Sequence, residues 1–125
     1  MARRILLVDD DRVSRLLSQT VLEKLGYEVV VLSDGRGAAD AVAGGDIAAV
    51  VMDCQMPHMD GFEATADIRS RENAGDKART PIIGLSARVM SGDEEVALSK
   101  GMDAYVTKPV RGRKLEAALD QLLGD

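Results

Sequence analysis

The stretch Ile47-Ala-Ala-Val-Val-Met52, which leads directly into Asp53, is a continuous apolar run and predicts a β-strand buried on both faces. Strands of this kind occur in parallel sheets that helices cover on either side, because neither face of the strand meets water. Similar apolar runs recur along the chain. They predict four further strands, at residues 4–8, 27–32, 81–85 and 104–107.

Helical patterns separate these strands. Apolar residues recur at helical spacing from Val13 to Leu25, and Gly26 ends that helix. Asp34 is placed to cap a second helix, and capping-box spacings at Asp60–Glu63 and Ser91–Glu94 begin two more. The expected helices cover residues 13–25, about 34–42, 60–68, about 91–100 and 115–123. The polar segment 71–80 is interpreted as a solvated loop.

This alternation predicts an α/β fold. Five strand–helix units in succession imply a parallel five-stranded sheet with helices on both faces. Right-handed crossovers restrict the arrangement to a doubly wound sheet. The length of 125 residues fits one domain, residues 1–125, and is too short for two ordinary ones. Functional groups in such sheets gather at the carboxyl ends of the strands.

The composition argues against several classes of function. A formal net charge of −5 is unsuited to nucleic-acid binding, because phosphate backbones require a basic face. The single cysteine, Cys54, excludes an intramolecular disulfide and fits a reducing cytoplasm. The apolar run near the N-terminus is too short for a signal peptide or a membrane span. We therefore expect a cytoplasmic domain that contacts neither membranes nor nucleic acid directly.

Charged and polar residues follow four of the predicted strands. Asp9-Asp10-Asp11 follow the first, Asp53 the third, Ser86 the fourth and Lys108 the fifth. The carboxyl ends of parallel strands meet at one edge of the sheet, so these groups are expected to gather there. Two carboxylates about 4 Å apart repel by about 4 kcal/mol at an effective dielectric constant of about 20. Carboxylate oxygens without histidine or cysteine ligands suit Mg²⁺ better than Zn²⁺, which predicts a magnesium site.

The same groups suit phosphoryl transfer. A carboxylate can act as the nucleophile that takes up a phosphoryl group. The phosphoryl oxygens then need positive charge around them, which Mg²⁺ and Lys108 can supply. Ser86 can donate a hydrogen bond to one of these oxygens. The combination indicates an acyl phosphate formed on a strand-end aspartate.

Other interpretations of these residues stay open at this point. Asp9 to Asp11 could form only a polar turn that caps the first helix. Asp9 and Asp11 also match the Asp-x-Asp motif of small haloacid-dehalogenase-like phosphatases, the main enzyme alternative. Those enzymes normally need a larger core domain, and that interpretation leaves Asp53 unexplained. Cys54 and Met56 are expected to be packing residues.

Four segments together resemble the receiver domains of bacterial response regulators. They are Leu6-Leu-Val-Asp-Asp10, Val51-Met-Asp-Cys-Gln-Met-Pro-His-Met-Asp-Gly61, Pro81-Ile-Ile-Gly-Leu-Ser-Ala87 and Gly101-Met-Asp-Ala-Tyr-Val-Thr-Lys-Pro109. The segments come in family order and cover the whole chain. The resemblance implies a flavodoxin-like (βα)5 fold with strand order 2-1-3-4-5 and a role in two-component signal transduction.

By this resemblance, Asp53 is the phospho-acceptor and receives its phosphoryl group from a phosphohistidine. Mg²⁺ would be ligated by Asp10, Asp53 and the backbone carbonyl of Gln55, with Asp9 acting through water. Lys108 would bind the phosphoryl group. The resemblance also implies a cis peptide bond between Lys108 and Pro109, a costly choice typical of functional turns.

The resemblance also assigns residues that act after phosphorylation. Ser86 and Tyr105 would be the switch residues: Ser86 moves toward the phosphoryl group, and Tyr105 turns into the space that is vacated. The surface changed would be the fourth helix, fifth strand and fifth helix, a face for a partner or a weak dimer. Such a protein is a signalling switch more than an enzyme, because it catalyses only its own phosphorylation and dephosphorylation.

The partners follow from the same resemblance. The segment Met52-Asp-Cys-Gln-Met-Pro57, taken with residues 101–105, resembles receivers attached to hybrid sensor histidine kinases. The partner in such a phosphorelay would be a histidine kinase, a histidine phosphotransfer protein or both. It would dock on the first helix beside the acidic edge, with Leu17 in the apolar contact. Most of that helix's apolar stripe is nevertheless expected to be core.

Overall fold

The sheet has the strand order that was expected. The structure, a computed structural model, describes residues 3–54, 56, 60–75, 79–86, 92–108 and 111–123. Its five strands form one parallel sheet in the order β2-β1-β3-β4-β5, so the predicted doubly wound fold is confirmed. The strands are β1 (Arg4–Val8), β2 (Glu28–Leu32), β3 (Ala49–Asp53), β4 (Ile82–Ser86) and β5 (Ala104–Thr107).

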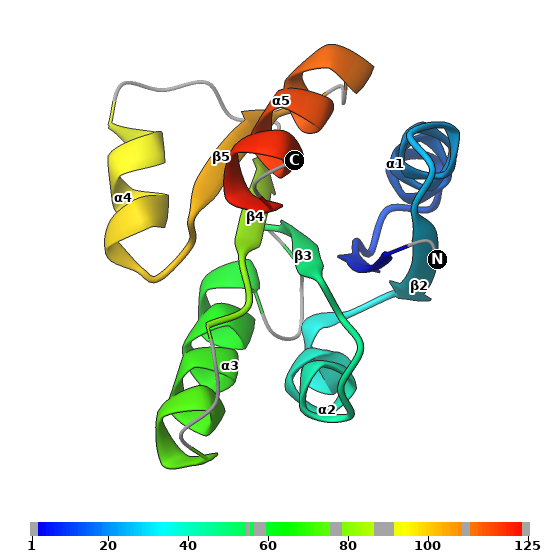
Figure 1. Cartoon of the computed structure of the whole chain (residues 1–125). Coiled ribbons are helices and arrows are strands. Elements are labelled where there is room, and N and C mark those ends of the chain that lie inside the picture. The colour runs from blue at the N-terminus through cyan, green and yellow to red at the C-terminus, as the bar shows by residue number, and fades with distance from the viewer. Residues whose placement is uncertain are drawn as a thin grey trace.

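Helices cover both faces of the sheet (Figure 1). They are α1 (Arg12–Lys24), α2 (Ala38–Ala43) after a short 3-10 turn η1 (Gly35–Gly37), α3 (Gly61–Gly75), α4 (Asp93–Ser99) and α5 (Gly112–Leu123). Alternate strand residues point to opposite faces. Leu6 and Val8 pack with α2, α3 and α4, whereas Ile5 and Leu7 pack with α1 and α5. No helix in the described part of the chain is both long and apolar enough to span a membrane.

The register of the strands brings their carboxyl ends to one edge of the sheet. Val8 pairs with Met52, and Asp53, the last residue of β3, pairs with Leu85. The start of α3 packs directly on this edge, because a Cβ at Gly61 would overlap the backbone of Asp53 and its neighbour. Glycine at position 61 therefore lets the helix approach the end of β3 closely.

The prediction of a solvated loop over residues 71–80 is wrong for its first five residues, because α3 continues to Gly75. The physical reason is that the polar side chains here are used inside the fold. Glu72 is buried, and its carboxylate accepts hydrogen bonds from the Arg69 guanidinium and from the backbone N–H of Thr80. In this part of α3 a buried ion pair is found where apolar residues at helical spacing would have predicted a helix.

The expectation that the apolar stripe of α1 is mostly core is also wrong for the first half of the helix. Val13, Leu16 and Leu17 are 74%, 54% and 43% exposed, whereas Ser18 and Leu22 are buried. At about 100° per residue, the exposed and buried sets lie on nearly opposite sides of the helix. A small polar residue, Ser18, occupies the buried side of the helix. The apolar residues of α1 are therefore divided between a buried face and an exposed face, which the sequence pattern alone does not separate.

Candidate functional site

Three aspartates gather at the carboxyl edge of the sheet. Asp9 and Asp10 follow β1, and Asp53 is the last residue of β3. One carboxylate oxygen of each lies within 4.8 Å of the others. Asp9 and Asp53 are buried and Asp10 is exposed, so the group opens to solvent on one side. The cluster that was predicted from the strand ends is confirmed.

Lys108 extends from the end of β5 into this cluster. Its Nζ donates to Asp53 Oδ2 and lies equally close, at 3.2 Å, to Asp9 Oδ2. Its backbone N–H donates to the carbonyl of Ser86 at 2.8 Å, which fixes the end of β5 against β4. Burial by itself lowers the pKa of Lys108, but the carboxylates of Asp53 and Asp9 outweigh it, and the net pKa is raised. Lys108 is therefore a permanent positive charge in the site at neutral pH.

Asp9 is held in place by the residues that begin α1. The hydroxyl of Ser14 donates to Asp9 Oδ2 at 2.7 Å, and the N–H of Asp11 donates to Asp9 Oδ1 at 3.0 Å. The Arg15 guanidinium donates to the backbone carbonyl of Asp9 at 3.0 Å. Neither Ser14 nor Arg15 was predicted from the sequence to belong to the site. The sequence feature that could have indicated them is their spacing from Asp11, which places both residues in the first turn of the helix.

Asp11 has a different role from its two neighbours. It is the N-cap of α1, and its Oδ2 accepts the backbone N–H of Ser14 at 2.8 Å. The capping interpretation therefore holds for Asp11, while Asp9 and Asp10 belong to the carboxylate cluster. The phosphatase alternative needs Asp11 as a second reacting group, and its engagement with the helix cap speaks against that use.

The two expected switch residues lie on neighbouring strands. Ser86 ends β4 and is buried beside the cluster, and it pairs with Thr107 in β5. Tyr105 lies two residues before Thr107, is partly buried, and packs against the core on the side of α4. Tyr105 also lines a groove of about 540 Å³ between α4, β5 and α5. Both residues are thus in the places that the resemblance implies, and their movement stays a prediction.

Cys54 follows Asp53 and is a packing residue. Its Sγ lies 3.9 Å from the Sδ of Met102, and the side chain is buried. Burial, with a smaller effect of the Asp53 charge, raises the pKa of the Cys54 thiol to about 12. The thiol therefore stays protonated and is a poor metal ligand or nucleophile. The Gln55 carbonyl and the peptide bond to Pro109 lie outside the described residues.

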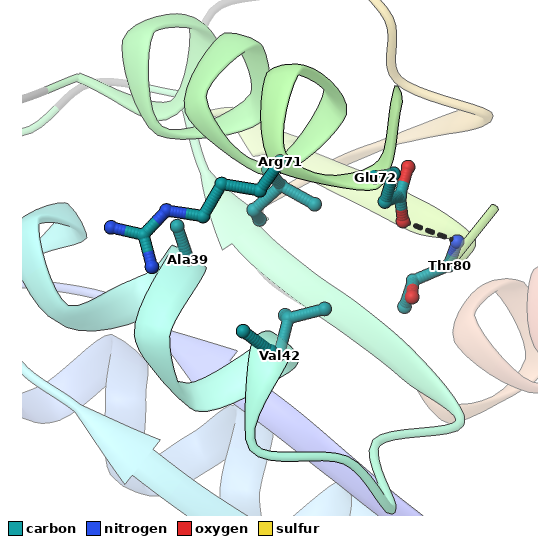
Figure 2. Close-up of a pocket in the computed structure, with 7 residues that line it drawn as sticks. Ala39, Val42, Arg71, Glu72 and Thr80 are labelled. Carbon is teal, nitrogen blue, oxygen red and sulfur yellow. Dashed lines mark hydrogen bonds between the residues drawn. The ribbon is translucent and has the colours of Figure 1, made fainter. Parts of the chain in front are cut away.

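A second hollow lies at the opposite edge of the sheet. It is small, about 70 Å³, and Figure 2 shows Ala39 and Val42 of α2 facing Arg71 and Glu72 of α3 across it. The dashed line in Figure 2 is the hydrogen bond from Thr80 to Glu72, which closes one side. No cluster of metal-binding groups among the described residues lies here, so the carboxyl edge remains the candidate site.

Comparison with known proteins agrees with this geometry. Residues 5–120 match the family described as the response regulator receiver domain. The chain is 43% identical to the sensor protein GacS of Pseudomonas syringae pv. syringae over 114 residues, which is 91% of this chain. Those residues make up 13% of that protein, so the chain spans a small part of the length of this relative.

Solved structures of receiver domains share the fold. The receiver domain of the sensor histidine kinase PA1611 from Pseudomonas aeruginosa, solved with magnesium coordinated in its active site cleft, is 36% identical, with a TM-score of 0.87 and 100% coverage of both chains. The co-crystal structure of the Saccharomyces cerevisiae receiver Ssk1 with the histidine phosphotransfer protein Ypd1 also matches. Its identity is 26% and its TM-score 0.84, over 97% of this chain and 88% of that one.

Proposed function

Because this chain belongs to the response regulator receiver family, we propose that it accepts a phosphoryl group on Asp53 from a phosphohistidine in a two-component phosphorelay. The observation that carries the proposal is the position of Asp53, buried at the end of β3 between Lys108 and two further carboxylates. A carboxylate oxygen of Asp53 attacks the phosphorus, and the bond from phosphorus to the histidine nitrogen breaks. Lys108 offsets the negative charge that arrives with the phosphoryl group.

Mg²⁺ is the proposed cofactor, and the donor set fits it. One ammonium group facing three carboxylates leaves two negative charges uncompensated, which a divalent cation balances. Asp10 and Asp53 are proposed as direct ligands with the carbonyl of Gln55, and Asp9 through water. All are hard oxygen donors, as Mg²⁺ prefers. When bound, the cation supplies positive charge to the phosphoryl oxygens. The magnesium ion in the PA1611 receiver supports this assignment.

Replacing Asp10 with alanine is expected to weaken Mg²⁺ binding and, at limiting Mg²⁺, phosphoryl uptake. Removing a residue that hydrogen-bonds a metal ligand typically lowers metal affinity by about 10- to 100-fold. Removing a direct ligand should lower it at least as much. Mg²⁺ is titrated by calorimetry or NMR, and uptake from acetyl phosphate is followed by intact mass. The bound group should be released by hydroxylamine, as an acyl phosphate is.

The matched control for this experiment is Asp120→Ala, which removes the same charge from an exposed position on α5. It should bind Mg²⁺ as the wild type does. Equal affinity in Asp10→Ala and wild type would remove Asp10 from the site. A wild-type protein that neither binds Mg²⁺ nor takes up phosphoryl groups would contradict the proposed function as a whole.

The proposed partner docks on the exposed apolar face of α1, formed by Val13, Leu16 and Leu17. This face adjoins Asp9 and Asp10, because α1 begins directly after them. A phosphohistidine must approach Asp53 from the open side of the cluster, so a partner seated on α1 can deliver it. The Ssk1 receiver, solved in complex with a histidine phosphotransfer protein, supports a partner of this class. A histidine kinase is the other candidate donor.

Leu17→Asp is expected to slow phosphoryl transfer from such a partner by about tenfold, because burying a leucine contributes about 1.5–3 kcal/mol at most and Leu17 is already half covered. Uptake from acetyl phosphate should be unchanged. The assay uses a phosphorylated histidine phosphotransfer domain that phosphorylates the wild type. Leu98→Asp on α4, with 44% exposure, is the matched control. Normal transfer to Leu17→Asp, or an equal loss in both variants, would overturn this docking site.

The wider setting is proposed from the relatives. The chain corresponds to a small part of GacS, so we place it as a receiver that is attached to a hybrid histidine kinase or works beside one, on the cytoplasmic side. In this setting it acts as a switch and not as an enzyme for a separate substrate. The coding sequence on either side of the chain tests this placement, because an adjoining kinase core is expected there. The absence of such a core would favour a stand-alone regulator.

A further inference from the structure

The carboxylate of Asp9 has a partner that the proposed reaction does not yet use. Asp9 is fully buried, and its Oδ2 is shared between the ammonium of Lys108 at 3.2 Å and the hydroxyl of Ser14 at 2.7 Å. Within the residues that the structure describes, its Oδ1 accepts one hydrogen bond, from the N–H of Asp11 at 3.0 Å. A carboxylate oxygen can accept two hydrogen bonds. Oδ2 is therefore fully engaged, while Oδ1 keeps acceptor capacity.

The hydroxyl of Ser14 is not needed to build α1. The backbone N–H of Ser14 already satisfies the helix cap by donating to Asp11 Oδ2. Alanine has a higher helix propensity than serine, so the hydroxyl costs the helix a little. Its contact with Asp9 spans five positions and links the first turn of the helix to the loop after β1. Arg15, in the same turn, holds the backbone carbonyl of Asp9.

We propose that Ser14 is a positioning residue that fixes the Asp9 carboxylate for the cation and for Lys108. This inference rests on the proposed function, because it presupposes the Mg²⁺ site. With the hydroxyl present, Ser14 and the N–H of Asp11 hold the two oxygens from opposite ends, so the carboxylate plane has one orientation. Without it, Lys108 remains as the side-chain partner of Oδ2 within the described part of the chain, and the carboxylate is free to rotate toward the ammonium. Asp9 is then less well placed to serve the cation.

Ser14→Ala is expected to weaken Mg²⁺ binding by up to about tenfold, because tenfold is the lower end of the range for residues that hydrogen-bond a direct metal ligand and Asp9 itself serves the cation through water. Ser14→Thr keeps a hydroxyl on Cβ and should stay close to the wild type. The readout is Mg²⁺ affinity of the unphosphorylated protein, measured by NMR titration, together with the melting temperature. A purely structural role would lower the melting temperature and leave the affinity unchanged.

Thr20→Ala is the matched control, because Thr20 lies on the same helix and its hydroxyl donates to the backbone carbonyl of Leu16, away from Asp9. This variant should bind Mg²⁺ normally. The inference is overturned if Ser14→Ala binds Mg²⁺ as tightly as the wild type, or if Ser14→Ala and Ser14→Thr are weakened equally. In both cases the wild type still binds Mg²⁺ and the proposed function stands. Failure of the wild type to bind Mg²⁺ would instead overturn both.

Discussion

Asp53→Asn is expected to abolish phosphoryl uptake from acetyl phosphate. The amide has the shape of the carboxylate but no anionic oxygen to attack phosphorus, so the nucleophile is lost while the fold is kept. Lys108 loses one of its two carboxylate partners and keeps Asp9. Intact mass measured in the presence of Mg²⁺ gives the result directly. Because Asp9 and Asp10 remain in this variant, the same measurement shows whether a neighbouring carboxylate can accept the phosphoryl group in place of Asp53.

The same variant tests the switch. In the wild type, the phosphoryl mimic beryllofluoride should shift the NMR signals of Ser86 and Tyr105, because Ser86 ends β4 beside Asp53 and Tyr105 lies on the adjacent strand. In Asp53→Asn these shifts should disappear. Phosphoryl incorporation into Asp53→Asn would show another acceptor and refute the central assignment. Unmoved Tyr105 signals in the wild type would limit the role of Ser86 to holding the acyl phosphate.

The carboxyl edge was predictable because its signals are local. The four strands that lead to the site are short, mainly apolar runs, and the chemically important residue stands directly at the end of each, as Asp53 follows Met52. Parallel strands bring such residues together whatever separates them in the sequence. The contact between Ser14 and Asp9 needs the first turn of α1 to form, so a list of strand ends cannot contain it. An apolar contact at Leu17 on α1 was expected, but the extent of the exposed face was missed because Ser18 takes a core position that an apolar residue usually fills.

The opposite edge of the sheet was not predictable in the same way. The Arg69 guanidinium on α3 donates to Glu72 and Asp103 and to the backbone carbonyls of Thr80 and Gly101. These partners lie up to 34 positions away in the sequence, and in sequence they look like ordinary surface charges. Only the folded chain shows that they form a single network, which ties α3 to the start of β4 and to the turn before β5.

Arg69→Met is therefore expected to destabilise the protein by about 3 kcal/mol, a large share of the roughly 5–15 kcal/mol that holds a typical domain folded. Methionine keeps the length of the side chain but leaves the carboxylate of Glu72, which is 9% exposed, without its cation. Asp103, which is 17% exposed, loses one of its two arginine partners and keeps Arg79. An uncompensated buried charge costs far more than the pair contributes. Urea unfolding monitored by circular dichroism measures the free energy of unfolding.

Arg36→Met is the control that separates burial from ion pairing as such. Arg36 pairs with Asp34 at 2.7 Å, as short as the Arg69 contacts, but the arginine side chain is 63% exposed and water can replace the partner. Its loss should change the unfolding free energy little. Folded Arg69→Met should also bind Mg²⁺ normally, because its network lies at the edge of the sheet away from Asp53. Equal destabilisation by the two substitutions would show that burial of the Arg69 network contributes nothing beyond a surface ion pair.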